Sequence, residues 1–470
     1  MTKDEEASSR DDWKRYPYPL SLTDPELIFP LAEGDQGAES NTYYVAGRLR
    51  GRESRRDWAF LVIFTANDIA HRLRADFYTF ALFDLATGEH GTYTAYDLPR
   101  PLRRRTDYRL SVARGRLDVS FRCGLGRSTW TTRAAPDGSP LPFDYHLDLC
   151  GRDAAWRRMR LVLDLETRKP PLPVGAEEYG GVKTCMGQQG THSYFQSDVR
   201  FSGTLEWGDV AEEVDGDCGW IDRQWAPRYL GLHTGLRNRR YRHEWRQIHL
   251  DNGVELGVWM HFDRRRGNRL IPFSGATIAD AAGRVATTAA FELERLSFVR
   301  DPRAVEPRYR LTDGGTYFAD RYRLRVPEWR LDLVSEPLAP VPAHALPIEY
   351  WSGPTRLSGT MNGLPVEGFG FHERTRVFSR DFELVEVLRD TLRHLPDDAA
   401  PPAASPPLRI ANLAWEIDGY LGHGDYEGAL RYLRERVRPE LERLAPPHVE
   451  HLLTIADDLA EALHRWWVRD

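Results

Sequence analysis

Two neighbouring runs, TYYVAGRLRG at residues 42–51 and DWAFLVIFTA at residues 57–66, indicate the fold class of this chain. Both are rich in β-branched and aromatic residues, and a short charged connection separates them, which is typical of adjacent strands. The same texture extends from about residue 38 to about residue 388. Further runs of this kind are DFYTFALFDLATGEHGTYTAYDL (76–98), DYRLSVARGRLDVSFR (107–122) and MRLVLDLE (159–166). We therefore expect a mostly β protein.

Turn signals within this region predict antiparallel hairpins. Asp251-Asn252-Gly253 separates QIHL from VELGVWMHF, and Met361-Asn362-Gly363 separates TRLSGT from LPVEGFGFH. Asn-Gly between apolar runs favours a tight hairpin because both residues tolerate positive φ. Many short antiparallel strands form a sandwich or a barrel, and this region is too long for one barrel. Two antiparallel β-barrels in tandem are the expected architecture.

The texture changes near the carboxyl end. LPDDAAPPAASPP (395–407) is typical of a Pro/Ala linker. The segments that follow carry apolar residues at three- and four-residue spacing, which predicts two or three amphipathic helices. We expect this extension to serve packing or dimerisation, so that the chain could form a homo-oligomer through it. The predicted divisions are an extended segment 1–37, barrels at 38–230 and 231–390, a linker 391–407 and helices at 408–470.

Composition excludes several classes of function. The 470 residues carry 64 Lys and Arg against 70 Asp and Glu, a net charge of −6, so we expect no nucleic-acid partner. The longest apolar run, WAFLVIF (58–64), is too short to span a membrane, and the charged amino terminus lacks the core of a secretory signal. Four separated cysteines without a CxxC pair fit a reducing, cytoplasmic environment. These cysteines are Cys123, Cys150, Cys185 and Cys218.

Familiar cofactor and metal motifs are missing. There is no Gly-rich phosphate loop, no GxSxG and no HExxH. His249 and His261 lie on the two arms of one predicted hairpin and are expected to be strand residues rather than ligands. We therefore expect neither a cofactor nor a metal.

One pair of segments carries candidate chemistry, namely GTHSYFQSDVRFSGTLEW (190–207) and GDCGWIDRQW (216–225). If both are strands joined by a turn near 208–217, His192 and Tyr194 would lie near Trp220 and Asp222, because i, i+2 residues share a face. Such a polar face is expensive to build inside a barrel. The alternative is that Asp222 pairs with Arg223 or another arginine and that Trp220 and Trp225 are core residues. The residue types alone leave both interpretations, the catalytic face and the structural ion pair, open.

Several motifs resemble the carotenoid 1,2-hydratase (hydroxyneurosporene synthase) family, whose relatives include kievitone hydratase and lipocalin-like Diels–Alderases. They are TYYVAGRLRG, DWAFLVIF, GWIDRQW (219–225) and IEYWSGPTRLSGTMNGLPVEGFGFHE (348–373). The resemblance implies two lipocalin-like barrels with a hydrophobic substrate pocket in or between them. It also implies that an Asp protonates an isoprenoid double bond and that water captures the carbocation.

The resemblance transfers to particular positions. The family has His-x-Trp on one strand and Tyr-x-Asp on a later one, which match His192-Ser193-Tyr194 and Trp220-Ile221-Asp222. The two aromatic positions are exchanged relative to the family, and Arg223 stands where many relatives have His. A permanent cation beside a carboxylate would weaken it as an acid.

We therefore expect a cofactor-independent enzyme that hydrates, isomerises or cyclises a hydrophobic polyene, isoprenoid or polyketide. Asp222, His192, Tyr194 and Trp220 are the expected catalytic residues, and substrate contacts are expected from Tyr44, Arg223, Trp225 and Trp351. Aromatic rings at such positions can stabilise positive charge. A non-catalytic carrier of an apolar ligand and a structural role for the helical extension are the alternatives.

Overall fold

The computed structural model describes residues 13–21, 27–70, 73–74, 76–97, 109–174, 183–185, 188–226, 241–264, 268–271, 274–300, 317–339, 350–375, 379, 381–402 and 404–468. The chain divides into two compact units, and each unit is built from three separate segments of the sequence. Unit 1 consists of Met1–Phe291, Val326–Leu331 and Pro337–Arg376. Unit 2 consists of Glu292–Arg325, Asp332–Glu336 and Val377–Asp470.

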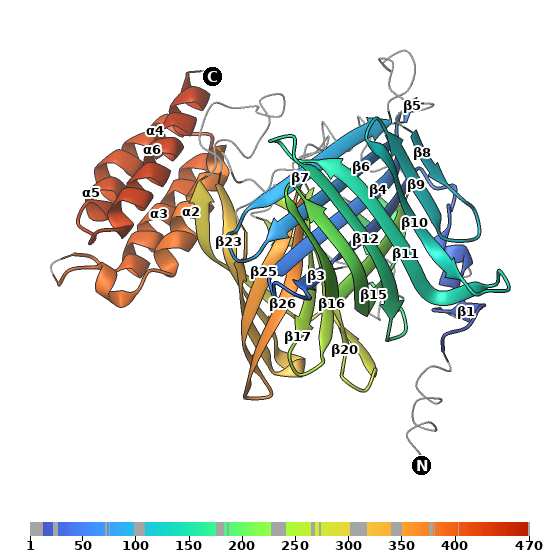
Figure 1. The fold of residues 1–470 in the computed structure, drawn as a ribbon. Coiled ribbons are helices and arrows are strands. Elements are labelled where there is room, and N and C mark those ends of the chain that lie inside the picture. The colour runs from blue at the N-terminus through green and yellow to red at the C-terminus, as the bar shows by residue number, and fades with distance from the viewer. Residues whose placement is uncertain are drawn as a thin grey trace. The chain divides into compact units, whose positions relative to one another are not determined.

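A curled antiparallel sheet forms the first part of unit 1 (Figure 1). Its main strands are β3 (Ser40–Gly51), β4 (Asp57–Ala70), β6 (Asp76–Asp84), β7 (His90–Asp97), β8 (Arg109–Val112), β9 (Asp118–Cys123), β10 (Gly126–Ala134), β11 (Pro140–Arg152), β12 (Arg158–Thr167), β15 (Gln188–Trp207) and β16 (Val210–Ala226). They follow the order β7-β6-β4-β3-β16-β15-β12-β11-β10-β9-β8. The short strands β5 (Leu73–Arg74), β13 (Leu172–Pro173) and β14 (Lys183–Cys185) pair with β4 and β15.

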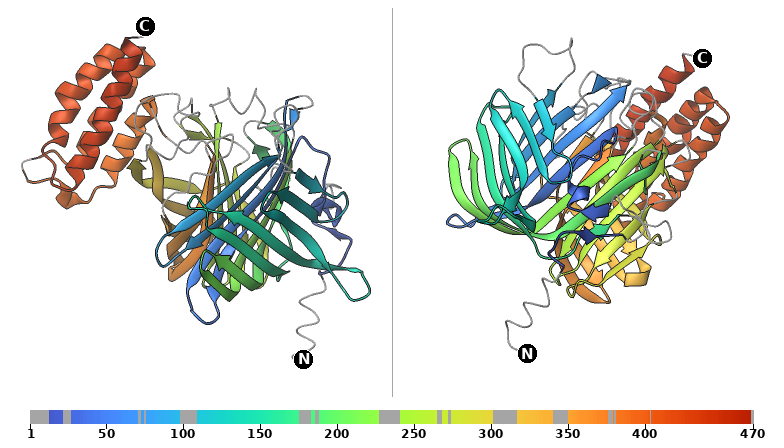
Figure 2. Two further views of the ribbon diagram at one scale, coloured as in Figure 1. Left: turned by 45° about the horizontal axis from the view of Figure 1, so that its top comes forward. Right: turned by 90° about the vertical axis from the view of Figure 1, so that its right-hand side faces the viewer.

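The first sheet curls until its ends meet, which makes it a near-barrel, as Figure 2 shows from two further directions. Strand β8, at one end of the order, contacts β6 and β7 at the other. The Tyr78 hydroxyl donates across the interior to the Cys150 carbonyl at 3.1 Å. Fully buried aliphatic and aromatic side chains, including Tyr43, Phe60 and Leu163, fill this interior. It is a packed core.

The amino-terminal segment packs against this near-barrel. It contains β1 (Tyr18–Pro19), β2 (Ile28–Phe29) and the 3-10 turn η2 (Leu31–Glu33). Phe29 lies against Phe143 of β11 and Tyr194 of β15, with ring centroids 5.1 and 4.6 Å apart. The segment is thus tied to the near-barrel by apolar contacts.

Unit 1 also contains a second group of antiparallel strands. They are β17 (Tyr241–Leu250), β18 (Glu255–Asp263), β19 (Arg269–Leu270), β20 (Gly275–Ala279), β21 (Val285–Thr288), β25 (Tyr350–Met361) and β26 (Leu364–Thr375), in the order β21-β20-β18-β17-β26-β25 with β19 beside β18. Both predicted Asn-Gly hairpins are confirmed. Between β25 and β26, Asn362 and Gly363 have φ of 54° and 79°, as a two-residue turn of this kind requires.

An apolar layer joins the two sheets of unit 1. It combines Tyr44, Phe195 and Trp220 of the near-barrel with Trp245 and Phe371 of the second sheet. Gly257 in β18 makes the close approach possible, because a Cβ there would stand 2.9 Å from the Phe195 ring. The outer face of β3, β15 and β16 is therefore buried against β17, β18 and β26.

Unit 2 combines strands and helices around a core of its own. Its strands β22 (Glu292–Arg300), β23 (Tyr317–Val326) and β24 (Leu331–Pro337, central part) are neighbours in that order, with η7 (Pro327–Trp329) between β23 and β24 in the chain. The helical part runs through η8 (Asp381–Glu383), α2 (Leu384–Arg393), η9 (Asp397–Ala399), α3 (Pro407–Gly422), α4 (Tyr426–Tyr432), the π-helical turn η10 (Leu433–Val437), α5 (Arg438–Leu441) and α6 (His448–Trp467).

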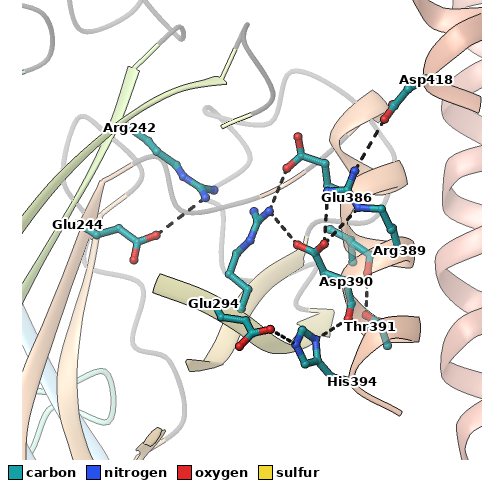
Figure 3. A network of polar contacts seen from close by, with 11 residues as sticks. Arg242, Glu244, Glu294, Glu386, Arg389, Asp390, Thr391, His394 and Asp418 are labelled. Atoms are coloured by element: carbon teal, nitrogen blue, oxygen red, sulfur yellow. Dashed lines mark hydrogen bonds and ion pairs between the residues drawn. The ribbon is translucent and has the colours of Figure 1, made fainter. Parts of the chain in front are cut away.

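The helices of unit 2 pack closely against its strands. Phe298 of β22 and Tyr322 of β23 share a core with α2, α3 and α6. Partly buried ion pairs reinforce this packing, since Arg295 of β22 lies 3.1 and 2.9 Å from carboxylate oxygens of Glu386 and Asp390 on α2. Figure 3 shows these two carboxylates within a larger polar network that includes Arg389 and His394. Within unit 2, strands and helices therefore depend on one another.

The expectation of a mostly β chain with large antiparallel sheets and a helical carboxyl-terminal part is confirmed. No helix in the described part of the chain is long and apolar enough to cross a membrane.

Candidate functional site

The β15–β16 hairpin decides which of the predicted site residues can meet. Its turn is tighter than expected, since Trp207 already pairs with Val210. This register pairs even-numbered residues of one strand with odd-numbered residues of the other, and two bulges between Gln196 and Phe201 leave it unchanged further along. Directly paired residues point to the same face of a sheet.

The register therefore separates the two predicted pairs. His192 is opposite Trp225, Tyr194 is opposite Arg223, and Asp222 is opposite Phe195. His192 and Tyr194 consequently lie on one face of the hairpin, and Asp222 lies on the other with Trp220. The expectation that all four share one face is corrected by this register.

Asp222 lies beside the apolar layer of unit 1. It is half-buried, and its partner in β3 is Tyr44. The Ser193 hydroxyl lies 3.5 Å from Oδ1 of Asp222 and also donates to the Arg223 carbonyl at 2.9 Å. Trp220, two residues before Asp222 in the same strand, stacks on Phe195 with centroids 4.4 Å apart and planes 9° apart.

Polar side chains of the second sheet complete the cluster. The Tyr44 hydroxyl lies 3.2 Å from the Ser352 hydroxyl of β25, and Ser352 is paired with Glu373 of β26. His243 Nε2 lies 3.6 Å from a Glu373 carboxylate oxygen. Burial, reinforced by the Glu373 carboxylate, raises the pKa of both Tyr44 and Tyr350 well above the usual value, so both remain hydrogen-bond donors. We call Tyr44, Asp222, Ser352 and Glu373 the inter-sheet site.

Aromatic and neutral groups surround the inter-sheet site. The ring of Trp245 meets that of Trp220 at 6.0 Å. The side-chain amide of Gln247 lies where its oxygen can accept from both indole N–H groups at 3.3 Å. Burial, together with the positive charges of Lys169 and Arg168, lowers the pKa of His249 to about 3, so this histidine is neutral at ordinary pH.

Arg223 belongs to the opposite face, where it holds the near-barrel to the amino-terminal segment. Its guanidinium donates to the Tyr43 hydroxyl at 2.8 Å and to the Gly34 carbonyl, and it lies 3.7 Å from the Tyr43 ring centroid. Its positive charge also lowers the pKa of the buried Glu33, although burial dominates and raises that pKa to about 7. The cation expected beside Asp222 thus lies on the other side of the sheet.

The other predicted contacts divide in the same way. Trp225 and Tyr194 belong to the apolar cluster under the amino-terminal segment, and His192 stacks on Trp225 at 5.6 Å. Trp351 lies between Tyr350 and Ser352 in β25 and so points to the opposite face, where the Arg374 guanidinium lies 3.7 Å from its ring centroid. The predicted residues therefore form two groups: Tyr44, Trp220 and Asp222 lie on one face of the sheet, and His192, Tyr194, Arg223 and Trp225 gather on the other.

Sequence reasoning missed the residues that the second sheet contributes, namely Gln247, Tyr350, Ser352 and Glu373. Tyr350 and Ser352 have the same i, i+2 spacing as Trp220 and Asp222, and they lie in the stretch 348–373 that carries the family resemblance. That spacing was the one feature of the sequence that could have indicated these two residues as site residues. Among the described residues, no three His, Cys, Asp or Glu side chains gather closely enough to hold a metal ion.

Comparisons with known proteins agree with this architecture. The AttH-like family model matches residues 23–375. A crystal structure of a protein from Nitrosomonas europaea assigned as AttH is similar with a TM-score of 0.54 and 19% identity, over 76% of this chain and 99% of that one. Kievitone hydratase from Nectria haematococca is similar with a TM-score of 0.52 and 13% identity, over 77% of this chain and 97% of that one. A comparison with curated proteins finds no match.

Proposed function

The chain belongs to the AttH-like family, and we propose that it is a cofactor-independent enzyme acting on a hydrophobic polyene, isoprenoid or polyketide. The reaction is a hydration, isomerisation or cyclisation with Asp222 as the proton donor. One observation carries this proposal: Asp222 lies beside the Ser193 hydroxyl and is paired with Tyr44, whose own hydroxyl meets that of Ser352 from the second sheet within an aromatic layer. A solved structure with a related fold is named a hydratase, which makes hydration the first reaction to test.

The position of Asp222 suits proton transfer to carbon. An acid protonates an alkene most readily where water is scarce. Trp220 and Phe195 exclude water on one side, and the Arg223 guanidinium is held on the other face of the strand. The nearby rings and the position of Arg223 both favour Asp222 as the acid over His192, because His192 lies on the same face of the hairpin as Arg223.

The surrounding rings suit the charge that such a step creates. Protonation of a polyene leaves a carbocation, and the faces of aromatic rings attract positive charge. Trp220, two residues from Asp222 in the same strand, and Trp245 present two indoles whose ring centroids lie 6.0 Å apart. In a cyclisation the same rings would hold one reactive conformer, and orientation would supply most of the acceleration.

Tyr44 and Ser352 suit the capture of the cation by water. Their hydroxyls lie 3.2 Å apart, and the raised pKa keeps the Tyr44 hydroxyl protonated. A water molecule held by this pair could pass its proton towards Glu373, which is paired with Ser352 in the sheet. Hydration would then use Asp222 as the acid and Glu373 as the final proton acceptor.

Asp222→Asn tests the proposal against the carrier alternative. General acid catalysis contributes about 10²–10⁴-fold, so turnover of an acyclic isoprenoid or polyketide polyene should fall at least about 100-fold. Ligand affinity, measured by quenching of tryptophan fluorescence, should stay near that of the parent chain. Asp217→Asn, an exposed position on the same strand, is the matched control and should keep full activity.

The products identify the reaction, because hydration adds one water to the mass whereas isomerisation and cyclisation leave it unchanged. Binding of these ligands by the parent chain without conversion of any of them would support the carrier instead. Equal turnover by Asp222→Asn and the parent chain would remove Asp222 as the acid.

A further inference from the structure

The turn between β11 and β12 has an unusual conformation at its tip. Trp156 has φ of 64°, in the left-handed region that a bulky side chain rarely adopts and that glycine or asparagine usually fills. Its backbone N–H donates to the Asp153 carbonyl at 3.0 Å, and its carbonyl accepts from the Arg152 guanidinium at 2.8 Å. The turn therefore holds Trp156 in a strained backbone conformation.

The Trp156 side chain gains little packing in return for this strain. It is 75% exposed, the largest exposed fraction among the large apolar side chains that the structure describes. Ala154 and Ala155 beside it are exposed as well, and so is Leu125 in the neighbouring β9–β10 turn. We call Leu125 and residues 154–156 the apolar tip. It contributes little to the core of the chain and suits contact with something outside it.

A positively charged hollow of about 490 Å³ lies beside the apolar tip. Its walls come from the β9–β10 turn, β10, β11 and β12, which are neighbours in the near-barrel (Figure 1). Leu125 of the apolar tip lines this hollow, so the two features adjoin. Four arginines line it against one acid, Asp148. The arginines are Arg127, Arg152, Arg158 and Arg160.

The acids near the hollow compensate only part of this charge. Arg160 lies 3.2 Å from Asp148, and Arg158 lies 3.9 Å from a carboxylate of β15. Arg127 and Arg152 donate to neutral oxygens instead, a hydroxyl at 3.0 Å and a backbone carbonyl at 2.8 Å, and neither forms an ion pair with any described residue. The hollow is thus positive in a chain whose net charge is −6.

We propose that this end of the near-barrel docks on the surface of bilayers that contain anionic phospholipids. Trp156 enters the interfacial region, where an indole ring meets apolar and polar neighbours at once. A lipid phosphate lies in the hollow against Arg127 and Arg152, because a guanidinium can donate two N–H groups to one phosphate. The leucine and the alanines of the apolar tip contact the acyl boundary.

A bilayer fits this combination better than a nucleic acid does. Phosphates of either partner would suit the arginines. The apolar tip, however, would lie against a charged backbone in a nucleic acid, whereas the interfacial region of a bilayer accepts apolar side chains. The docking does not depend on the chemistry proposed for Asp222. It agrees with that chemistry, because hydrophobic polyenes and isoprenoids partition into bilayers.

Co-sedimentation of the full chain with vesicles tests the docking. One set of vesicles contains phosphatidylcholine alone, and the other contains phosphatidylcholine and phosphatidylglycerol in equal parts. The chain should bind the mixed vesicles more tightly, and a higher salt concentration should weaken this binding. Arg127→Gln with Arg152→Gln should lower the affinity about 30-fold, because each arginine near an anionic surface contributes about fivefold. Arg409→Gln with Arg434→Gln, at exposed positions in the helical part of unit 2, is the matched control and should bind like the parent chain.

Trp156→Gly separates docking from folding. Glycine adopts the left-handed conformation without strain, so the midpoint of thermal unfolding should stay the same or rise. Vesicle affinity should fall about 10-fold or more, because the variant has no indole to bury in the bilayer. Trp467→Ala, at an exposed position on α6, is the control and should keep the vesicle affinity of the parent chain. A lower unfolding midpoint for Trp156→Gly at unchanged vesicle affinity would show that the ring serves the fold, and would overturn the proposal.

Three further outcomes would contradict the docking. Equal affinity for both kinds of vesicle would remove the phosphate contacts. Competition by inorganic phosphate at constant ionic strength, with no effect of Trp156→Gly, would indicate a simple anion site. Binding of a single-stranded oligonucleotide without binding to vesicles would assign the apolar tip and the hollow to a nucleic acid.

Discussion

Glu33→Gln is expected to make unit 1 more stable at high pH while leaving it unchanged at low pH. The Glu33 side chain is 1% exposed and accepts hydrogen bonds from the Tyr145 hydroxyl at 2.7 Å and the Tyr16 hydroxyl at 2.9 Å. Burial raises its pKa from 4.5 to about 7, even though these hydroxyls and Arg223 oppose the rise. Glutamine keeps an acceptor oxygen for the tyrosines and has no charge to bury.

The sign of the pH dependence follows from proton binding. Between pH 4.5 and about 7 the folded chain keeps the Glu33 proton whereas the unfolded chain has released it, so stability falls as the pH rises through this range. At about 1.4 kcal/mol for each tenfold change in proton affinity, the loss is roughly 3 kcal/mol. Below pH 4.5 this contribution is fully present, and above about pH 7 the loss is complete.

Urea unfolding followed by tryptophan fluorescence at a series of pH values measures the effect. Burial also raises the pKa of Glu255 to about 7, so the parent chain carries two contributions of the same sign. Glu33→Gln should remove one of them and the double variant with Glu255→Gln should remove both, which leaves the rise in stability up to about pH 6.5 that the lowered pKa values of buried His249 and His372 impose. An equal slope in the parent chain and Glu33→Gln would refute the reasoning.

Three further variants address other parts of the molecule. Arg223→Met should cost about 3–5 kcal/mol of unfolding free energy because it removes a buried cation from its partners, yet turnover per folded molecule should persist; lost turnover at unchanged stability would place Arg223 in the reaction. Gly257→Val should cost about 1–3 kcal/mol by overpacking and also lower turnover, since its side chain would meet Phe195; a neutral result in both assays would contradict the close packing of the sheets. If the chain associates through its helices, Leu408→Asp with Trp415→Glu, at positions 60% and 55% exposed on α3, should reduce the mass measured by light scattering; an unchanged oligomer would exclude this face.

Local patterns predicted the strands and hairpins because the signals that form them are local. TYYVAGRLRG and DWAFLVIFTA became β3 and β4, and the Asn362-Gly363 turn joins β25 to β26 as expected. The helix α2 was missed because most of it lies within the stretch 231–390 assigned to the second barrel and its end lies in the predicted linker, although Leu384, Val387 and Leu388 have helical spacing. There the surrounding β texture outweighed a short amphipathic pattern.

The candidate site was predicted only in part because it depends on register and on tertiary contact. The expected turn near 208–217 was longer than the one that forms, and a change of one residue in register moves a whole set of side chains to the other face. Ser352 and Glu373 reach the site from strands that lie more than a hundred residues further along the chain. No spacing rule links them to Tyr44, because only the packing of two sheets does so.

Two adjacent residues, Asp222 and Arg223, show why composition around a buried acid is a poor guide to its role. In the sequence they look like an ion pair, but consecutive residues of a strand point to opposite faces. Arg223 reaches Tyr43 and Gly34 and so anchors the amino-terminal segment to the near-barrel. Asp222 instead points towards the layer between two sheets, where hydroxyls and indoles gather. The anchoring contacts therefore belong to Arg223, and Asp222 lies on the face to which the proposed chemistry is assigned.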